Sequence, residues 1–250
     1  MSELSPHYDR IADAYAAARR HYANRRYLAF QHEVMLQQVT DDLRQMRVLD
    51  CMSGSCEFAY VARERVGSLH AVDISTGILQ QATPPLPTTR TCASALQLPF
   101  APGTFDAVFI SGGLHHIRAD YETALEELHR VLKPGGWLVA AEPADDNPLI
   151  FAARSLLHIV NDLYEEGEAG FRREELEAGF RRNGFTNVST HRHGYVAYTL
   201  IGNTDVFPLF TNLQSEAAID ALLKLDRLSP QVPLWRSMAL AHITSGRCVK

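Results

Sequence analysis

The sequence is poor in cysteine and lacks long apolar runs, and both shortages limit what the protein can be. Its 250 residues include four cysteines, none of them in a C-x-x-C pair: Cys51, Cys56, Cys92 and Cys248. Cysteine-based zinc sites and disulfide scaffolds need paired cysteines, so we expect no metal site and reduced thiols. Reduced thiols are typical of a cytoplasmic protein, which we therefore expect. No apolar stretch approaches the roughly 18 residues that cross a bilayer, and no charged-then-apolar leader precedes Pro6, so we expect no membrane segment.

Positive charge is scarce as well. The formal net charge is -5, which gives the protein no general attraction to nucleic acid or to anionic membranes. A small molecule is therefore the expected partner. One basic cluster with interleaved aromatic residues runs from Arg19 to Arg26. In an acidic protein, a solvated helix face or an anionic small substrate explains this cluster better than a nucleic-acid surface does.

Strand and helix patterns alternate after the first fifty residues, which predicts an α/β fold with a doubly wound, mostly parallel sheet. With 46% hydrophobic residues, a chain of this length can bury one good core, so we expect one domain. We expect strands over residues 47–51, 69–72, 88–92, 105–111 and 137–142. We expect helices over residues 58–66, 76–82 and 121–132, the second capped by Ser75 or Thr76 and the third by Asp120.

The pattern changes beyond strand 137–142. We expect helices over residues 149–165, 171–183 and 215–228, a strand over 185–192, and a last strand near 236–243. The helix between the two final strands fits either a parallel crossover or an antiparallel edge, so their relative direction stays open at this point.

The segment from Val48 to Cys56 is the most informative part of the chain. It predicts a buried strand, a tight turn at a helix start and, 23 residues after Asp50, a second strand that ends in Asp73. In doubly wound folds such a turn approaches a nucleoside cofactor through its backbone, and the acid accepts hydrogen bonds from the ribose hydroxyls. This spacing alone would allow NAD.

Four blocks in order resemble the class I S-adenosylmethionine-dependent methyltransferases of the small-molecule type. They are Val48-Leu49-Asp50 with Gly54; Val72-Asp73-Ile74-Ser75; Ala95 to Phe100 with Gly103 to Val108 and Leu114-His115-His116-Ile117; and Leu125 to Gly136. The resemblance implies a Rossmann-like sheet of seven strands with an antiparallel last strand. It also implies S-adenosylmethionine as methyl donor, S-adenosylhomocysteine as product and a small-molecule acceptor.

The first loop departs from the family pattern. Met52 and Cys56 stand at two of the three positions where the family has glycine, which serves there because the backbone must approach the ligand or adopt positive φ. Ser94 stands where an acidic residue usually receives the adenine amino group, and its hydroxyl can accept that hydrogen bond without charge assistance.

The resemblance assigns a set of cofactor-binding residues. Asp73 would hold the ribose, Asp50 would orient the turn or reach the amino end of the cofactor, and Gly54 would allow close backbone approach. Tyr15 would shield the sulfonium, and Arg19 or Arg20 would pair with the methionyl carboxylate. The full expected set is Tyr15, Arg19, Asp50, Met52, Gly54, Asp73, Ile74, Ser94, Ala95 and Ser111.

Three histidines are candidates for removing a proton from the acceptor, because neutral imidazole is a suitable base near pH 7. His115 and His116 follow the strand that should end beside the reactive methyl group, although packing or hydrogen bonding is the plainer role for this pair. His191 follows a strand expected to end near the acceptor, as do His193, Tyr195 and Tyr198.

We expect residues 1–45 to form a helical lid on a methyltransferase domain at 46–250, with an acceptor-pocket insertion at about 145–215. Apolar residues are frequent in the lid and the insertion, which favours a hydrophobic or aromatic acceptor. O-methylation is expected only because it is common. Two alternatives stay open: a non-methylating reaction such as cyclisation on the same fold, and a non-catalytic binding subunit with a vestigial pocket. A homodimer is compatible with the sequence.

Overall fold

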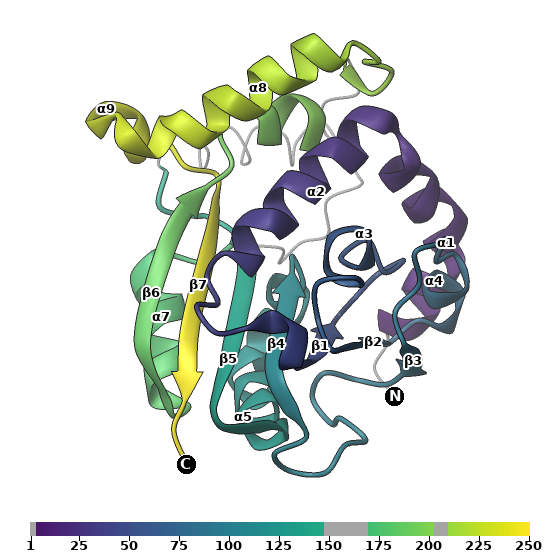
Figure 1. Cartoon of the computed structure of the whole chain (residues 1–250), viewed down its shortest axis with the longest axis vertical. Coiled ribbons are helices and arrows are strands. Elements are labelled where there is room, and N and C mark those ends of the chain that lie inside the picture. Colours follow the sequence, from purple (N-terminus) through teal and green to yellow (C-terminus); the bar gives the residue numbers. More distant parts are fainter. Residues whose placement is uncertain (1–3, 148–169, 203–209) are drawn as a thin grey trace.

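The computed structural model describes residues 4–147, 170–202 and 210–250. The expected helix at 149–165 therefore lies outside the described residues, as do Phe151, Leu156, Leu157, Ile159, Tyr164 and Phe207 of the expected acceptor region. A seven-stranded sheet forms the centre of the molecule (Figure 1). Its strands are β1 (Arg47–Cys51), β2 (Ser68–Asp73), β3 (Thr89–Cys92), β4 (Phe105–Ser111), β5 (Leu132–Pro143), β6 (Phe185–His193) and β7 (Ala241–Cys248).

The strand order is β3-β2-β1-β4-β5-β7-β6, and β7 runs antiparallel to both of its neighbours while β1 to β5 pair in parallel. This confirms the seven-stranded, mostly parallel sheet, and it resolves the direction of the final strands as antiparallel. The chain builds outward from β1 to β3 and then returns to place β4 on the other side of β1. Open α/β sheets bind ligands at such a reversal, outside the carboxyl ends of the strands.

Helices cover both faces of the sheet (Figure 1). The helices are α1 (Leu4–Arg20), α2 (Tyr22–Leu36), α3 (Ala59–Ala62), α4 (Thr76–Gln80), α5 (Tyr121–Val131), α7 (Arg173–Arg182), α8 (Glu216–Leu228) and α9 (Pro233–Arg236). Short 3-10 turns lie at Leu43–Gln45, Leu114–Asp120 and Ser229–Gln231, and a π turn at Tyr198–Gly202. Within the described residues, no helix is long and apolar enough to cross a membrane.

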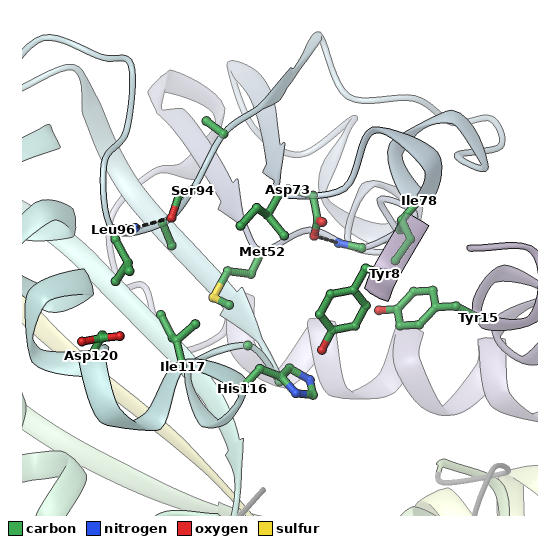
Figure 2. A pocket seen from close by; sticks show the side chains of 16 residues that line it. Tyr8, Tyr15, Met52, Asp73, Ile78, Ser94, Leu96, His116, Ile117 and Asp120 are labelled. Atoms are coloured by element: carbon green, nitrogen blue, oxygen red, sulfur yellow. Dashed lines mark hydrogen bonds between the residues drawn. The ribbon is translucent and has the colours of Figure 1, made fainter. Parts of the chain in front are cut away.

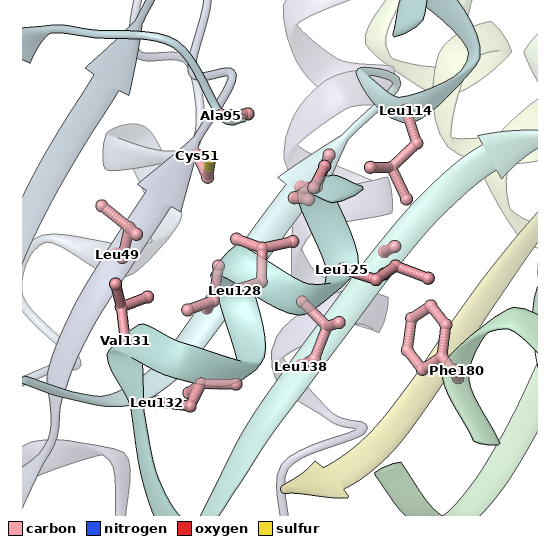
Figure 3. Packing of buried hydrophobic residues seen from close by; sticks show 14 of the residues in the cluster. Leu49, Cys51, Ala95, Leu114, Leu125, Leu128, Val131, Leu132, Leu138 and Phe180 are labelled. Carbon is pink, nitrogen blue, oxygen red and sulfur yellow. The ribbon is translucent and has the colours of Figure 1, made fainter. Parts of the chain in front are cut away.

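Two apolar layers hold the helices on the sheet. On one face, Leu125 and Leu128 of α5 and Phe180 of α7 pack on residues such as Leu49 and Leu138 (Figure 3). On the other face, apolar residues of α2 and α3 pack on Val48, Phe109 and Val139. Successive strand residues point to opposite faces, so a strand buried on both sides is apolar without alternation. This is the reason that β1 and β4 could be placed from the sequence.

The last strand is the main error of the sequence prediction. Residues 233–236 form helix α9, and the strand lies at Ala241–Cys248 instead of near 236–243. The polar residues Thr244 and Ser245 of this inner strand are fully or almost fully buried, and their hydroxyls lie within hydrogen-bond distance of those of Thr190 and Ser189 on β6. The helix expected at 58–66 is also shorter, at Ala59–Ala62, and Asp120 precedes α5 without a side-chain capping bond.

The N-terminal helices are fastened to the sheet by polar contacts. The carboxylate of Asp9 in α1 accepts a hydrogen bond from the hydroxyl of Ser75 at 2.5 Å and one from the backbone N–H of Gly77 at 2.9 Å. These bonds attach α1 to the start of α4, just beyond the end of β2. Helix α1 therefore stands beside the carboxyl edge of the sheet (Figure 1).

Candidate active site

A cleft opens at the carboxyl edge of the sheet, beside α1 (Figure 2). Its empty volume is about 810 Å³, including the opening to solvent. The cleft is lined by Tyr8, Tyr15, Met52, Gly54, Asp73, Ile74, Ile78, Ala93, Ser94, Ala95, Leu96, Gly112, Gly113, His116, Ile117 and Asp120. The loops after β1, β2, β3 and β4 supply most of these residues, as the strand order requires.

Asp73 ends β2 and connects two of these loops. Its Oδ2 accepts the backbone N–H of Gly54 at 2.9 Å, and its Oδ1 accepts the backbone N–H of Ser75 at 3.0 Å. Burial raises the pKa of the Asp73 carboxyl to about 6, while the hydrogen bonds from Ser75 and Gly54 act in the opposite direction. The carboxylate is therefore mostly ionised at pH 7 and keeps lone pairs that can accept two further donors.

The first loop takes a glycine-like path although two of its three glycine positions carry side chains. Met52, Gly54 and Cys56 have φ values of 59°, 54° and 64°. Positive φ costs a residue with a Cβ atom roughly 1–2 kcal/mol. Both bulky residues therefore adopt the backbone conformation that glycine would supply, and the surrounding structure fixes the loop.

The side chain of Met52 lies in the cleft with its sulfur turned toward Ile117 (Figure 2). It occupies the space beside Gly113, where a β-carbon would lie 2.7 Å from the sulfur. Methionine therefore narrows the cleft at this wall without closing it, since Gly54 and Asp73 still line the open volume.

The loop after β3 presents small residues to the cleft. The hydroxyl oxygen of Ser94 accepts the backbone N–H of Leu96 at 3.2 Å, which folds the loop into a turn. A serine oxygen has a second lone pair, so it can still accept a donor from a ligand. Ala93, Ala95 and Leu96 add an apolar surface beside it, suited to the faces of an aromatic ring.

Helix α1 closes one side of the cleft with two tyrosines. The hydroxyl of Tyr15 would lie 2.6 Å from a β-carbon on Gly54, so glycine is required for this close approach. The guanidinium of Arg19 stacks on the Tyr15 ring, 3.5 Å from its centroid, and does not line the cleft. The ring of Tyr8 meets that of His116 edge-on, with 5.7 Å between centroids (Figure 2).

The cleft is acidic. Asp73 and Asp120 line it, and no lysine or arginine is among the described residues that do so. Two further carboxylates lie close to the loop, Asp50 and Glu57. Burial, with Glu57 and Asp73 as further causes, raises the pKa of Asp50 well above its ordinary value, and its Oδ2 has no partner among the described residues. Such a site favours a cationic ligand over a phosphorylated one.

Further polar contacts lie where β4 and β5 end. The hydroxyl of Ser111 accepts the side-chain N–H of Gln31 at 3.0 Å and lies 3.1 Å from Nε2 of His32, both in α2. Nδ1 of His115 lies 2.8 Å from a carboxylate oxygen of Glu142, whose side chain is fully buried. Neither Ser111 nor His115 lines the cleft, but both adjoin residues that do.

The structure thus brings together most of the residues expected at the cofactor site. Tyr15, Met52, Gly54, Asp73, Ile74, Ser94, Ala95 and His116 line one cleft, whereas Arg19, Asp50, Ser111, His115 and His191 do not. His191 lies on β6, separated from β4 by β5 and β7. Sequence reasoning missed the lining position of Asp120 and the contact of Glu142 with His115. The sequence did offer a signal for Glu142, because it is an acidic residue at the end of an apolar strand.

A methyltransferase domain model matches residues 49–140, the part of the chain that builds β1 to β5. The chain is 30% identical over 167 residues to a demethylmenaquinone methyltransferase of Geobacillus kaustophilus, with 63% of this chain and 66% of the relative covered. It is 34% identical over 153 residues to the enzyme of that name from Thermus thermophilus, with 57% and 63% covered. The match thus spans slightly under two thirds of each of these relatives.

Solved structures share the fold at low identity. A SAM-dependent methyltransferase of Thermotoga maritima superposes with a TM-score of 0.68 at 15% identity, covering 98% of this chain and 99% of the other. A phosphoethanolamine N-methyltransferase 2 of Haemonchus contortus, solved with S-adenosylhomocysteine, gives 0.66 at 17% identity, covering 100% of this chain and 61% of the other. These structures support the architecture described above.

Proposed function

Because this chain belongs to the class I S-adenosylmethionine-dependent methyltransferase family, we propose that it transfers a methyl group from S-adenosylmethionine to a small hydrophobic or aromatic acceptor. The observation that carries this proposal is the acidic cleft around Asp73. A carboxylate at the end of the second strand, beside a loop with positive φ at three positions, suits a nucleoside whose other end carries positive charge.

The residues present fit this cofactor. The carboxylate of Asp73 would accept hydrogen bonds from the ribose hydroxyls, and Ser94 with Ala95 would border the adenine. The unpartnered oxygen of Asp50 supports a nearby cationic group, because a buried carboxylate without a partner is costly. The methyltransferase domain match over residues 49–140 favours this cofactor over NAD, which the spacing alone would allow.

The bound cofactor would supply an activated methyl group with a good leaving group. The protein's own tasks are then to orient the acceptor, exclude water and remove a proton where the acceptor carries one. The wall of the cleft that would face the acceptor is formed by Tyr8, His116 and Ile117. Tyr15 would shield the sulfonium with its ring. The lipophilic quinone precursor in the names of the relatives supports a hydrophobic acceptor here.

Calorimetric titration with S-adenosylmethionine and S-adenosylhomocysteine tests the cofactor assignment. We expect Asp73→Asn to weaken both by at least about tenfold, since an amide presents a donor where the ribose hydroxyls need an acceptor. Asp106→Asn is the matched control, because Asp106 pairs with Lys133 away from the cleft. Failure of the wild-type protein to bind either compound would refute the proposal.

A methyl-transfer assay on phenols, quinols and amines then tests the reaction itself. Binding without methyl transfer to any acceptor would favour a non-methylating reaction on the same cofactor. Met52 is the observation behind this second candidate, because its side chain reshapes the wall of the cleft where the family has glycine.

A further inference from the structure

Glu142 is placed to control the chemistry of His115. It is the penultimate residue of β5, and its side chain has no exposed surface. Its Oε1 accepts the backbone N–H groups of Gly113 at 3.1 Å and Leu114 at 2.9 Å. Its Oε2 accepts the backbone N–H of His115 at 3.3 Å and faces Nδ1 of the same histidine at 2.8 Å. Both oxygens thus receive donors from one turn.

This arrangement selects one tautomer of His115. A carboxylate that already accepts three N–H groups is an acceptor only, so Nδ1 must carry the proton that points to Oε2. In the neutral ring, Nε2 then has a free lone pair. No hydrogen bond to Nε2 is found within the described part of the chain, and the side chain keeps 13% of its surface exposed.

His115 also lies next to the cleft. Its Cε1 would be 3.8 Å from a β-carbon on Gly112, and its ring lies 4.0 Å, centroid to centroid, from that of His116. Gly112 and His116 both line the cleft, at the carboxyl end of β4. A small shift or an acceptor entering beside Gly112 would bring Nε2 within reach of a ligand.

We propose that His115 is the general base of the reaction and that Glu142 is its positioning residue, which identifies the acceptor as a hydroxyl compound that arrives protonated, such as a phenol or an enol. This proposal rests on the proposed methyl transfer. It distinguishes His115 from His116, because the contact with Glu142 fixes the tautomer of His115.

The proton transfer is balanced as follows. The O–H bond of the acceptor breaks, its proton goes to Nε2, and the electron pair stays on oxygen, which forms the new bond to the methyl carbon. Glu142 stabilises the resulting imidazolium through the Nδ1–H bond, in the way that a buried carboxylate supports a catalytic histidine. The proton then leaves to solvent, so the base is restored. Amine acceptors that are neutral would not need this step.

The tautomer of His115 can be read without cofactor or acceptor. In long-range 1H–15N spectra at pH 8 we expect Nδ1–H and a bare Nε2 in the wild-type protein. Glu142→Gln must turn its amide N–H₂ toward some of the donors that the carboxylate accepts, so we expect it to move the His115 proton to Nε2. Glu142→Asp keeps an acceptor and should retain the wild-type tautomer. Nε2–H in the wild-type protein would overturn the proposal.

Activity gives the second readout. We expect His115→Ala to lower kcat about 100-fold or more, with KM and S-adenosylhomocysteine affinity nearly unchanged, and added imidazole to restore at least about tenfold. His129→Ala is the matched control, since His129 bonds to Val249 far from the cleft in α5. Full activity of His115→Ala on a phenolic acceptor, or a loss that imidazole does not restore, would refute the base. The rescue result decides even where Glu142→Gln fails to fold.

The failure of this proposal is distinguishable from that of the proposed function. A protein that binds no S-adenosylhomocysteine fails as a methyltransferase whatever the tautomer of His115. A protein that binds it and methylates amines only, with unchanged activity in His115→Ala, remains a methyltransferase but contradicts the base.

Discussion

Met52 and Gly113 share one volume: a β-carbon on Gly113 would lie 2.7 Å from the sulfur of Met52 and 2.8 Å from its Cβ. The first residue belongs to the loop after β1 and the second to the turn after β4, so two neighbouring strand ends are fitted to each other. Met52 adds a side chain to the loop after β1, and Gly113 has no side chain in the turn after β4. The bulk at position 52 is therefore accommodated by the fold.

Gly113→Ala should destabilise the protein by about 1–3 kcal/mol, because its new methyl group would overlap the fixed Cβ of Met52 as well as the flexible sulfur. Met52→Gly should remove most of this cost, since it deletes both atoms and suits the positive φ at position 52. Urea unfolding of the wild type, both single variants and the double variant measures the coupling. Additive effects would contradict the shared volume.

Cys56→Gly should be more stable than Cys56→Ala by about 1 kcal/mol, because φ at this position is 64°. This is the reverse of the ordinary order, in which glycine is the less stable of the two. Ala59→Gly in α3 is the control for the ordinary order and should lose about 1 kcal/mol. Chemical denaturation measures all three. Lower stability of Cys56→Gly than Cys56→Ala would show that the loop relaxes to negative φ.

The affinity for S-adenosylhomocysteine should be constant above about pH 7 and fall by up to about tenfold per unit below pH 6. The pKa of Asp73 is about 6 in the free protein, and a ligand that donates hydrogen bonds to its carboxylate must lower that pKa. Protons therefore compete with the ligand as the pH falls through 6. Calorimetry across pH 5–8 tests this, and Asp73→Asn should bind weakly without the pH dependence.

Burial lowers the pKa of His193 to about 3, against an ordinary value of 6.5. Between these two values the unfolded chain binds more protons than the folded one, so the stability contributed by neutral His193 is present above pH 6.5 and is lost as the pH falls below it. The loss at pH 5 is about 2 kcal/mol. His32 has the same shift, for the same reason, and should lose a similar amount.

The comparison of variants isolates this term, since the raised pKa of Asp73 changes stability in the opposite direction over the same pH range. We expect His193→Asn to lose about 2 kcal/mol less than the wild type between pH 7 and pH 5. Equal losses in the two proteins, measured by urea unfolding at both pH values, would show that His193 becomes protonated within the fold.

The sequence predicted β1 and β4 well because each is a short apolar run bounded by turn residues, whereas β3 is a polar, mostly exposed strand placed by the turn residues around it. Strand β7 was misplaced because Thr244 and Ser245 are polar although both are buried, with their hydroxyls paired to those of Thr190 and Ser189 on β6. The apolar residues near Trp235 belong to a helix instead, where Trp235 is largely exposed. Hydrophobic periodicity identifies buried apolar side chains, and it does not identify buried polar side chains that are paired with one another.

The lining of the cleft was predicted more fully than the contact that we propose for proton transfer. Asp73, Gly54 and Ser94 follow strands in order, so their meeting at one edge follows from topology. The contact between His115 and Glu142 joins residues 27 positions apart, one in the turn after β4 and the other at the end of β5. Its geometry depends on the turn after β4, and one sequence gives no measure of how such a turn aims its imidazole.

The positive φ at Met52 also makes the cleft adjustable. The backbone path of the loop is held by its neighbours, including the bond from Gly54 to Asp73, so position 52 can change without moving the carboxylate that we propose as the ribose acceptor. Met52→Gly would enlarge the cleft on the side that faces Ile117. Synthetic sulfonium donors enlarged on that side, with allyl or propargyl groups in place of methyl, would then find room that the natural side chain now denies them.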